Sequence, residues 1–219
     1  MGRLNLFGGK AADVIRVLLV NYPTTWTIRE LSRESGVALG WTHEVCMTLI
    51  QERFAIRESE RQEINLMEPL ALLKRWANNY NFTAVNRFID YYAGDEDVTK
   101  LLNRLGGVDG PKYAVTGLAG ALLVAPFVRP TNVHIYVISE DDVGRWAKQL
   151  SLMPIEENGN VKFAIAPSGG VFYGSQDADG VEVVSDVQLY IDLLNYPGRG
   201  EEAAREILKL IEKRWRSEA

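Results

Sequence analysis

The chain has 219 residues, of which 47% are hydrophobic and 24% are charged, and this composition excludes an intrinsically disordered chain. No apolar run approaches the roughly 20 residues that a membrane-spanning helix needs, and the first ten residues lack the apolar core of a secretory signal, so we predict a cytoplasmic protein without membrane contact. The single cysteine, Cys46, excludes an internal disulfide and a cysteine-based zinc site, and we predict no metal and no cofactor.

The net charge of −5 is unevenly distributed along the chain. Residues 1–82 contain ten Lys/Arg and nine Asp/Glu, a balance of +1, whereas residues 83–219 contain fourteen and twenty, a balance of −6. The acidity therefore lies in the second part. A near-neutral module can still bind a nucleic-acid duplex when its arginines share one face, although it binds less tightly than a basic module does.

The first segment predicts two helices separated by a turn. Apolar residues fall on one helical stripe of residues 11–20, and Pro23 ends that helix because proline cannot continue it. The sequence Thr-Ile-Arg-Glu from Thr27 to Glu30 predicts a capping box, in which each of these two side chains accepts a backbone N–H of the other residue. The short helix that follows ends at Gly36, since glycine tolerates the left-handed turn.

A third helix and a hairpin follow. The third helix has an inward stripe at spacings of three and four, formed by Thr42, Val45, Cys46 and Leu49. Two apolar triplets that bracket the charged stretch 57–63 predict a two-stranded hairpin. Together these elements have the layout of a winged helix-turn-helix. The predicted bounds are 11–20, 28–35 and 39–53 for the helices and 54–66 for the hairpin.

The remainder of the chain alternates helices with strands, which predicts a layered α/β domain. We place the boundary in the polar stretch around residue 82, so that a winged helix-turn-helix domain spans 1–82 and a mixed α/β domain spans 83–219. The predicted fold class is therefore α/β (α+β). Helices are predicted at 69–80, 85–92, 96–105, 113–126, 140–150, 186–194 and 201–215, and strands at 133–138, 161–165 and 181–184.

In a winged helix-turn-helix the third helix lies in the major groove of DNA, with its first residues nearest to the base edges. His43 and Thr48 can hydrogen-bond to bases or phosphates, and Trp41 can pack on a sugar or a thymine methyl group. Phosphate contacts position a protein on the duplex, and base contacts specify the sequence. The candidate DNA-binding residues are Gly40, Trp41, His43, Glu44, Met47 and Thr48 of the third helix and Arg29, Arg33, Arg53, Arg57 and Arg61 around it.

Several of these residues also have a purely structural interpretation. Arg57 and Arg61 can pair with the glutamates of the hairpin, Trp41 can belong to the core or to an interdomain contact, and His43 can be an ordinary surface residue. Glu44 is unfavourable near phosphates unless it accepts from a cytosine amino group. A winged module can also serve protein contacts alone.

Two other segments contain residues typical of metal or phosphate sites. Residues 174–180 contain Gly-Ser and Asp-x-Asp, as nucleotidyltransferases do, but the carboxylates follow too closely, and we predict a surface loop. Residues 195–200 form a glycine-rich helix start, where Glu201 and Glu202 would repel phosphate but suit the helix dipole. We predict no enzyme. The alternative is a metal-dependent nuclease-like or nucleotidyl-transfer activity that uses Asp177, Asp179 and Glu182.

Four segments carry a resemblance to a known family: LGWTH at 39–43, LLKRWANNYNF at 72–82, YAVTGLAGALLVAP at 113–126 and VSDVQLYIDLLNYPGRGEEAA at 184–204. They resemble the AbiEi-like transcriptional regulators, which are antitoxins of type IV toxin–antitoxin systems. The resemblance implies an N-terminal winged helix that binds operator DNA and represses its own operon. It also implies a C-terminal domain that opposes a partner toxin of nucleotidyltransferase type. An orphan regulator without a toxin stays open, and so does a homodimer.

The resemblance does not assign antitoxin residues individually. The candidates lie in or near the segments that carry it, and we expect buried structural roles for most of them. They are Arg129, Gln188, Tyr190, Asp192 and Arg199.

Overall fold

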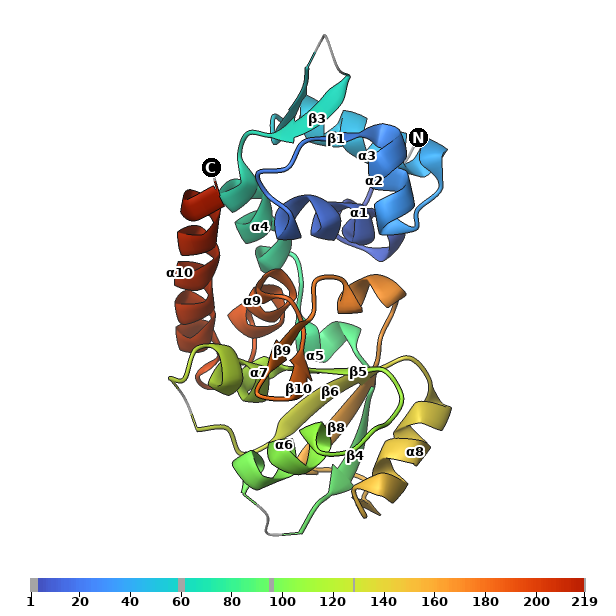
Figure 1. The fold of residues 1–219 in the computed structure, drawn as a ribbon, viewed down its shortest axis with the longest axis vertical. Coiled ribbons are helices and arrows are strands. Elements are labelled where there is room, and N and C mark those ends of the chain that lie inside the picture. The colour runs from blue at the N-terminus through green and yellow to red at the C-terminus, as the bar shows by residue number, and fades with distance from the viewer. Residues whose placement is uncertain (1–3, 59–61, 95–96, 128, 219) are drawn as a thin grey trace.

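The computed structural model describes residues 4–58, 62–94, 97–127 and 129–218. Figure 1 shows two parts stacked along the long axis, a helical part with a small sheet above a larger part with a wide sheet. Both parts combine helices with strands, so the chain has the α/β fold class predicted from its sequence.

The first part consists of α1 (Gly9–Val20), β1 (Trp26–Thr27), α2 (Ile28–Ser35), α3 (Leu39–Gln51), β2 (Ala55–Arg57) and β3 (Glu63–Leu66). Its three strands form an antiparallel sheet in the order β1-β3-β2, in which Ile64 faces Trp26 on one side and Arg57 on the other. This is the predicted order of elements with one strand added. The sequence did not indicate β1, because two residues are too short to show a periodic pattern.

Local signals set the ends of these helices. The Thr27 hydroxyl accepts the Glu30 backbone N–H at 3.3 Å and the Glu30 carboxylate accepts the Thr27 backbone N–H at 2.9 Å, so the predicted capping box is confirmed. The helix α2 ends at Gly36, whose φ of 66° is left-handed. The predicted inward stripe of α3 is confirmed as well, since its four residues are all fully buried: Thr42, Val45, Cys46 and Leu49.

The second part contains strands β4 (Phe88–Tyr92), β5 (Tyr113–Thr116), β6 (Val133–Val137), β7 (Met153–Pro154), β8 (Val161–Ile165), β9 (Gln176–Ala178) and β10 (Val181–Val183). Its helices are α5 (Phe82–Val85), α6 (Val98–Gly106), α7 (Gly117–Val124), α8 (Glu140–Gln149), η1 (Gly169–Phe172), α9 (Asp186–Leu194) and α10 (Gly200–Glu218), and α4 (Pro69–Asn78) leads into it. None of these described helices combines the length and the apolarity that crossing a membrane requires.

The sheet of the second part has the strand order β7-β4-β8-β6-β5-β10-β9. The pairs β6–β8 and β5–β10 are parallel, and the other neighbouring strands are antiparallel. The helices α5, α7 and α9 lie between this sheet and the first part, whereas α6 and α8 lie on its far side (Figure 1). The second part therefore presents helices, not its sheet, to the first part.

Two of the predicted helices were wrong. Residues 88–92 of the predicted helix 85–92 form β4, which pairs with β8 from Phe88 opposite Ala164 to Tyr91 opposite Val161. The run Phe-Ile-Asp-Tyr-Tyr is too short for its periodicity to distinguish a helix from a strand, and its aromatic residues suit a sheet. The predicted helix 113–126 is a strand, β5, followed by α7, and Gly117 makes the change of direction with a left-handed φ of 63°.

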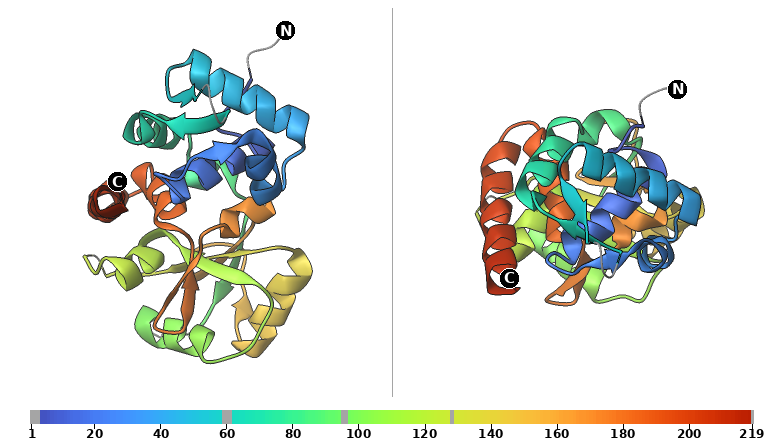
Figure 2. Two further views of the ribbon diagram at one scale, coloured as in Figure 1. Left: turned by 45° about the horizontal axis from the view of Figure 1, so that its top comes forward. Right: turned by 90° about the horizontal axis from the view of Figure 1, so that it is seen from above.

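The helix α1 is shared by both parts. Every residue from Ala11 to Leu19 is buried. The helix packs against α2 and α3 on one side and against α9 and η1 on the other. At its end, the Trp215 indole of α10 donates to the Leu19 carbonyl at 3.3 Å. The left view of Figure 2 shows the same stacking of the first part on the second, and the right view looks along the stacking axis, so that the two parts overlap.

A buried polar network crosses this junction. The Arg16 guanidinium donates to the Asp13 carboxylate at 2.7 Å and to the side-chain oxygen of Gln188 at 2.8 and 3.0 Å. The Gln188 amide donates in turn to Asp192 at 2.8 Å, and the Thr116 hydroxyl donates to the same carboxylate at 2.6 Å. Burial lowers the pKa of Arg16 and raises the pKa of Asp192 to about 7. The network satisfies a buried guanidinium with partners from both parts.

Candidate nucleic-acid interface

The outward side of α3 is open to solvent. Its buried stripe anchors the helix, and most positions between the buried residues face solvent, although Met47 and Ile50 pack in part against the core. Gly40, His43 and Glu44 are exposed, Trp41 is 45% exposed, and Met47 and Thr48 are half-buried. A side chain at Gly40 would meet nothing within 4 Å, so a partner can approach the backbone closely there.

One flank of this side brings three predicted residues together. Arg29 of α2, His43 of α3 and Arg57 of β2 line one hollow of about 300 Å³, together with Thr27. Guanidinium groups in such a hollow can hold a phosphate or a base edge. The exposed Leu39 lines the same hollow and was missed by the sequence analysis. Leu39 lies one helical turn before His43, and this spacing could have predicted that the two residues share one side of α3.

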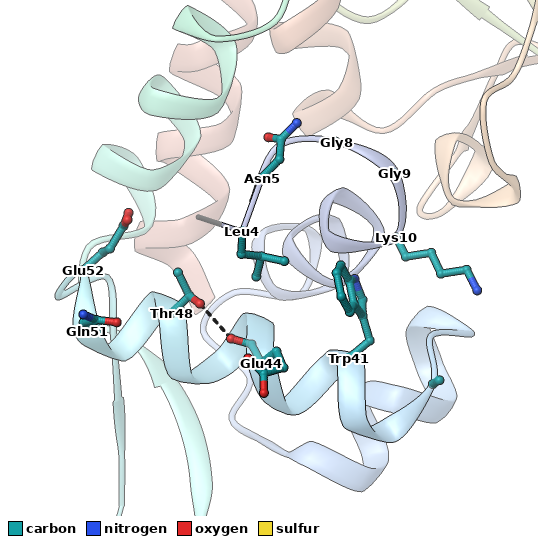
Figure 3. A pocket seen from close by; sticks show the side chains of 11 residues that line it. Leu4, Asn5, Gly8, Gly9, Lys10, Trp41, Glu44, Thr48, Gln51 and Glu52 are labelled. Atoms are coloured by element: carbon teal, nitrogen blue, oxygen red, sulfur yellow. Dashed lines mark hydrogen bonds between the residues drawn. The ribbon is translucent and has the colours of Figure 1, made fainter. Parts of the chain in front are cut away.

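The other flank of α3 forms a groove with the N-terminal segment 4–10. Trp41, Glu44 and Thr48 line the groove from α3, across a space of about 1360 Å³ (Figure 3). The Thr48 hydroxyl donates to the Glu44 carbonyl at 2.8 Å, so its proton is used within the helix and only its lone pairs can meet DNA. That the N-terminal segment lines a groove beside α3 was not predicted from the sequence. The buried side chain of Leu6 anchors this segment, and an apolar residue at this position is the sequence feature that could have predicted its placement.

The other predicted arginines do not join Arg29 and Arg57. Arg33 lines a different hollow, between α2 and the second part of the molecule. Arg53 is exposed beyond the end of α3, and its left-handed φ of 63° is strained for a residue other than glycine. Arg61 lies outside the described residues.

The structure also shows the surroundings of Trp41, Arg57 and Cys46. Trp41 is too exposed to belong to the core. Across the described chain, Arg57 forms no ion pair with a glutamate of the hairpin. Cys46 is buried, and its burial raises the pKa of the thiol to about 12, so it remains protonated within the core of the module.

The carboxylates of segment 174–182 belong to a β-hairpin. The strand β9, which the sequence analysis treated as loop, pairs with β10 and sets Asp177 opposite Glu182. The Asp177 carboxylate accepts the Gly180 backbone N–H at 3.2 Å, and Asp179 makes the turn with a φ of 54°. Nowhere in the described ranges do three His, Cys, Asp or Glu side chains come together as a metal site requires. The glycine-rich segment 195–200 leads into the start of α10 as predicted, with Glu201 and Glu202 in the first turn of that helix.

The five candidate antitoxin residues fall into two groups. Gln188, Tyr190 and Asp192 are buried on α9, as predicted for most of them, and two of these belong to the network around Arg16. Arg129 and Arg199 are exposed, and Arg199 pairs with Glu202 at 2.8 Å.

Comparison with known proteins connects the second part with one family. Residues 65–213 match a family model described as "Transcriptional regulator, AbiEi antitoxin, Type IV TA system". The match runs from β3 into α10 and does not include α2 or α3. The same comparisons match the chain to no curated protein and to no solved structure. Because the match covers well over half of its length, the chain belongs to the AbiEi antitoxin family of transcriptional regulators in type IV toxin–antitoxin systems.

Proposed function

We propose that the chain binds operator DNA through α3 and the hollow beside it, and that it thereby represses its own operon. The observation that carries this proposal is the hollow in which Arg29, His43 and Arg57 meet next to the exposed start of α3. The two guanidinium groups supply positive charge for phosphates, and the outward residues of α3 remain available for base edges. Membership of a family of transcriptional regulators supports it.

The geometry supports different roles for the residues around α3. Arg29 and Arg57 lie at the edge of the helix, where the phosphate backbone would pass, so we assign affinity to them. His43 and Glu44 are exposed near the start of α3, and we assign sequence preference to them, with Glu44 accepting from a cytosine amino group. Trp41, on the opposite flank, would pack on a sugar or a thymine methyl group.

We infer a separate role for residues 83–219, which is to oppose a partner toxin of nucleotidyltransferase type. The family description supports an antitoxin, and the balance of −6 in this part disfavours contact with DNA. Residues 1–82 would then carry DNA binding. Since operator binding requires access to the chromosome, we place the protein in the cytoplasm.

A salt titration tests operator binding. The full chain is titrated against a labelled duplex from upstream of its own gene and against an unrelated duplex of equal length. We expect selective binding, and Arg29→Ala and Arg57→Ala should each lower the slope of log affinity against log salt by about 1. Arg145→Ala removes an exposed arginine of α8 and should leave the slope unchanged. Equal affinity for both duplexes at low salt would contradict the proposal.

Co-expression tests the antitoxin role independently. The chain is produced together with the product of the gene adjacent to its own, and growth is measured. We expect the wild type to restore growth, and the double variant Arg29→Ala/Arg57→Ala should restore it equally, because both arginines lie in the first part. A double variant that no longer restores growth would show that the two functions share one surface.

A further inference from the structure

The hollow that Arg33 lines is a crevice between the two parts of the molecule. Its walls are the end of α2, the loop 169–174, and Lys112 just before β5, and Val17 of α1 also lines it. In Figure 1 this loop, coloured orange, lies below α1 and α2. The crevice has a volume of about 370 Å³, which is the size of a small-molecule site.

The acidic side chains of this crevice are already bonded within the protein. The Asp13 carboxylate accepts from the Arg16 guanidinium and from the Ser168 hydroxyl, both at 2.7 Å. The Glu34 carboxylate accepts from the Tyr173 hydroxyl at 2.7 Å. The charge of Asp13 is also offset by the buried Arg16 cation beside it. The Asp13 charge is thus compensated, whereas Glu34 keeps its negative charge, because a neutral hydroxyl does not neutralise a carboxylate.

The basic side chains of the crevice, unlike the acidic ones, are not bonded to other described residues. Within the part of the chain that the structure describes, neither Arg33 nor Lys112 donates a hydrogen bond or forms an ion pair. The Lys112 ammonium lies 4.9 Å from the centre of the Phe172 ring, and this contact holds it at the wall of the crevice. The N–H donors of both cations are therefore available to a ligand.

Glycines set the width of the crevice. A Cβ on Gly170 would lie 2.0 Å from the Asp13 carboxylate, and one on Gly174 would lie 2.6 Å from Val20. The loop can therefore approach α1 this closely only with glycine at these two positions. This close approach keeps the wall that carries Phe172 against the first part of the molecule.

We propose that this crevice binds the phosphate group of a small molecule between Arg33 and Lys112. The lining sets Arg33 and Lys112 against the one uncompensated carboxylate of Glu34, which leaves a net charge of +1. A guanidinium can hold two phosphate oxygens at once, and an ammonium adds a point charge. The crevice volume of about 370 Å³ leaves room for the rest of a ligand up to the size of a mononucleotide, whereas Val17 and Phe172, which also line it, are almost fully buried and add little contact surface.

The position of the crevice connects this ligand with the DNA-facing side. Arg33 and Arg29 lie one helical turn apart on α2, yet they line different hollows. A phosphate held in the crevice would contact both α2 and the loop of the second part. It would thus be bound by both parts of the molecule, away from the hollow proposed for the operator.

Calorimetric titration of the full chain with adenosine 5′-monophosphate tests the proposal, with adenosine as the probe that lacks phosphate. We expect the monophosphate to bind and adenosine not to, because the cations recognise the phosphate. Arg33→Gln and Lys112→Gln should each lower the affinity about tenfold or more, the loss typical of a hydrogen bond between charged groups. Arg145→Gln and Lys148→Gln, which change exposed basic residues of α8 outside the crevice, are the matched controls and should keep the wild-type affinity.

The proposal is overturned if neither compound binds, if adenosine binds as tightly as the monophosphate, or if both crevice variants keep the wild-type affinity. A phosphate of the DNA backbone has the same chemistry, so the two crevice variants are also titrated with the operator duplex. A salt slope lowered by about 1 would assign the crevice to DNA and overturn the small-molecule ligand. An unchanged slope supports it. The nucleotide titration contains no DNA, so its result stands even if operator binding fails.

Discussion

The helices α1 and α3 belong to the same part of the molecule but differ in how many of their sides are buried. From Ala11 to Leu19 every residue of α1 is buried, including a charged pair, whereas α3 buries four residues and leaves its other side open. The helix α1 is therefore core to both parts, and α3 is a surface helix of one part. The comparison shows that stability and recognition are assigned to different helices, so substitutions on the two should have separable effects.

The largest effect is expected in the network that holds α1. Gln188→Leu removes the acceptor of two bonds from Arg16 and leaves that buried guanidinium with Asp13 alone. A hydrogen bond to a charged group contributes about 1.5–3 kcal/mol, so we expect the loss of two to lower the free energy of unfolding, measured in urea, by about 3–5 kcal/mol. As a control, Arg205→Ala breaks an exposed ion pair on α10 and should cost less than about 1 kcal/mol. Similar losses in the two variants would show that α1 is not held by this network.

The pH dependence of stability tests the same network at Asp192. Burial raises the pKa of Asp192 to about 7, whereas an unfolded aspartate titrates near 4. Between these values the folded chain holds the extra proton, so the contribution of Asp192 to the free energy of unfolding falls as the pH rises. We expect the difference between wild type and Asp192→Asn to fall by about 1.4 kcal/mol per pH unit in this window. A difference that is independent of pH would mean that Asp192 is ionised throughout.

His134 makes the free energy of unfolding depend on pH in the opposite direction, so the wild type has to be compared with Asp192→Asn. Burial lowers the pKa of His134 to about 4, so between about pH 6.5 and 4 the unfolded chain binds the extra proton. Its contribution to the free energy of unfolding falls as the pH falls. In the wild type the two slopes oppose each other, whereas in Asp192→Asn only the loss towards acid remains. Unfolding curves of both proteins at several pH values between 4 and 7 measure this.

A smaller effect is expected at the start of α2, between the two helices compared. Thr27→Ala removes the hydroxyl that accepts the Glu30 N–H and so breaks the capping box. We expect a loss of about 1 kcal/mol in the free energy of unfolding. Ser217→Ala, at the exposed end of α10, provides the control and should change it by less than about 0.5 kcal/mol. A Thr27→Ala variant as stable as wild type would show that α2 is held by its packing alone.

The smallest effect on stability is expected on the outward side of α3. His43→Ala removes an exposed side chain and should change the free energy of unfolding by less than about 0.5 kcal/mol. Its effect should instead be on the preference among operator sequences, measured by competition between duplexes with single base changes. A loss of stability above about 1 kcal/mol would show that His43 supports the fold, and the contrast between α1 and α3 would then fail.

The first part of the fold was more predictable than the second because its signals are local. The cap of α2 depends on Thr27 and Glu30, three residues apart, and its end depends on Gly36 alone. The strand β4 instead forms because Phe88 to Tyr91 find partners in β8, more than 60 residues away in sequence. Without those partners the same run also fits a helical pattern. The strand β5, opposite β6 and next to the distant β10, was missed for the same reason.

The candidate site was predictable residue by residue, but its grouping was not. The helical period alone predicted which positions of α3 face outward, and the structure confirms exposure at Gly40, Trp41, His43 and Glu44, whereas Met47 is half-buried against the core and Thr48 is half-buried. It could not show that Arg29 and Arg57 share a hollow, since they come from different elements. Nor could the helical period show that Arg33, one turn beyond Arg29, lines a different hollow together with Lys112 from the second part.

By itself the sequence determined the three helices of the first part, the hairpin that follows and the outward side of α3, because caps, glycine turns and apolar periods act over a few residues. Only the tertiary structure decided that α1 is buried in both parts, that Arg16 is bonded to Gln188, and that a crevice lined by Arg33 and Lys112 lies between the parts. These features depend on contacts between residues far apart in the chain, and such contacts exist only once the sheet and the helices that cover it have packed.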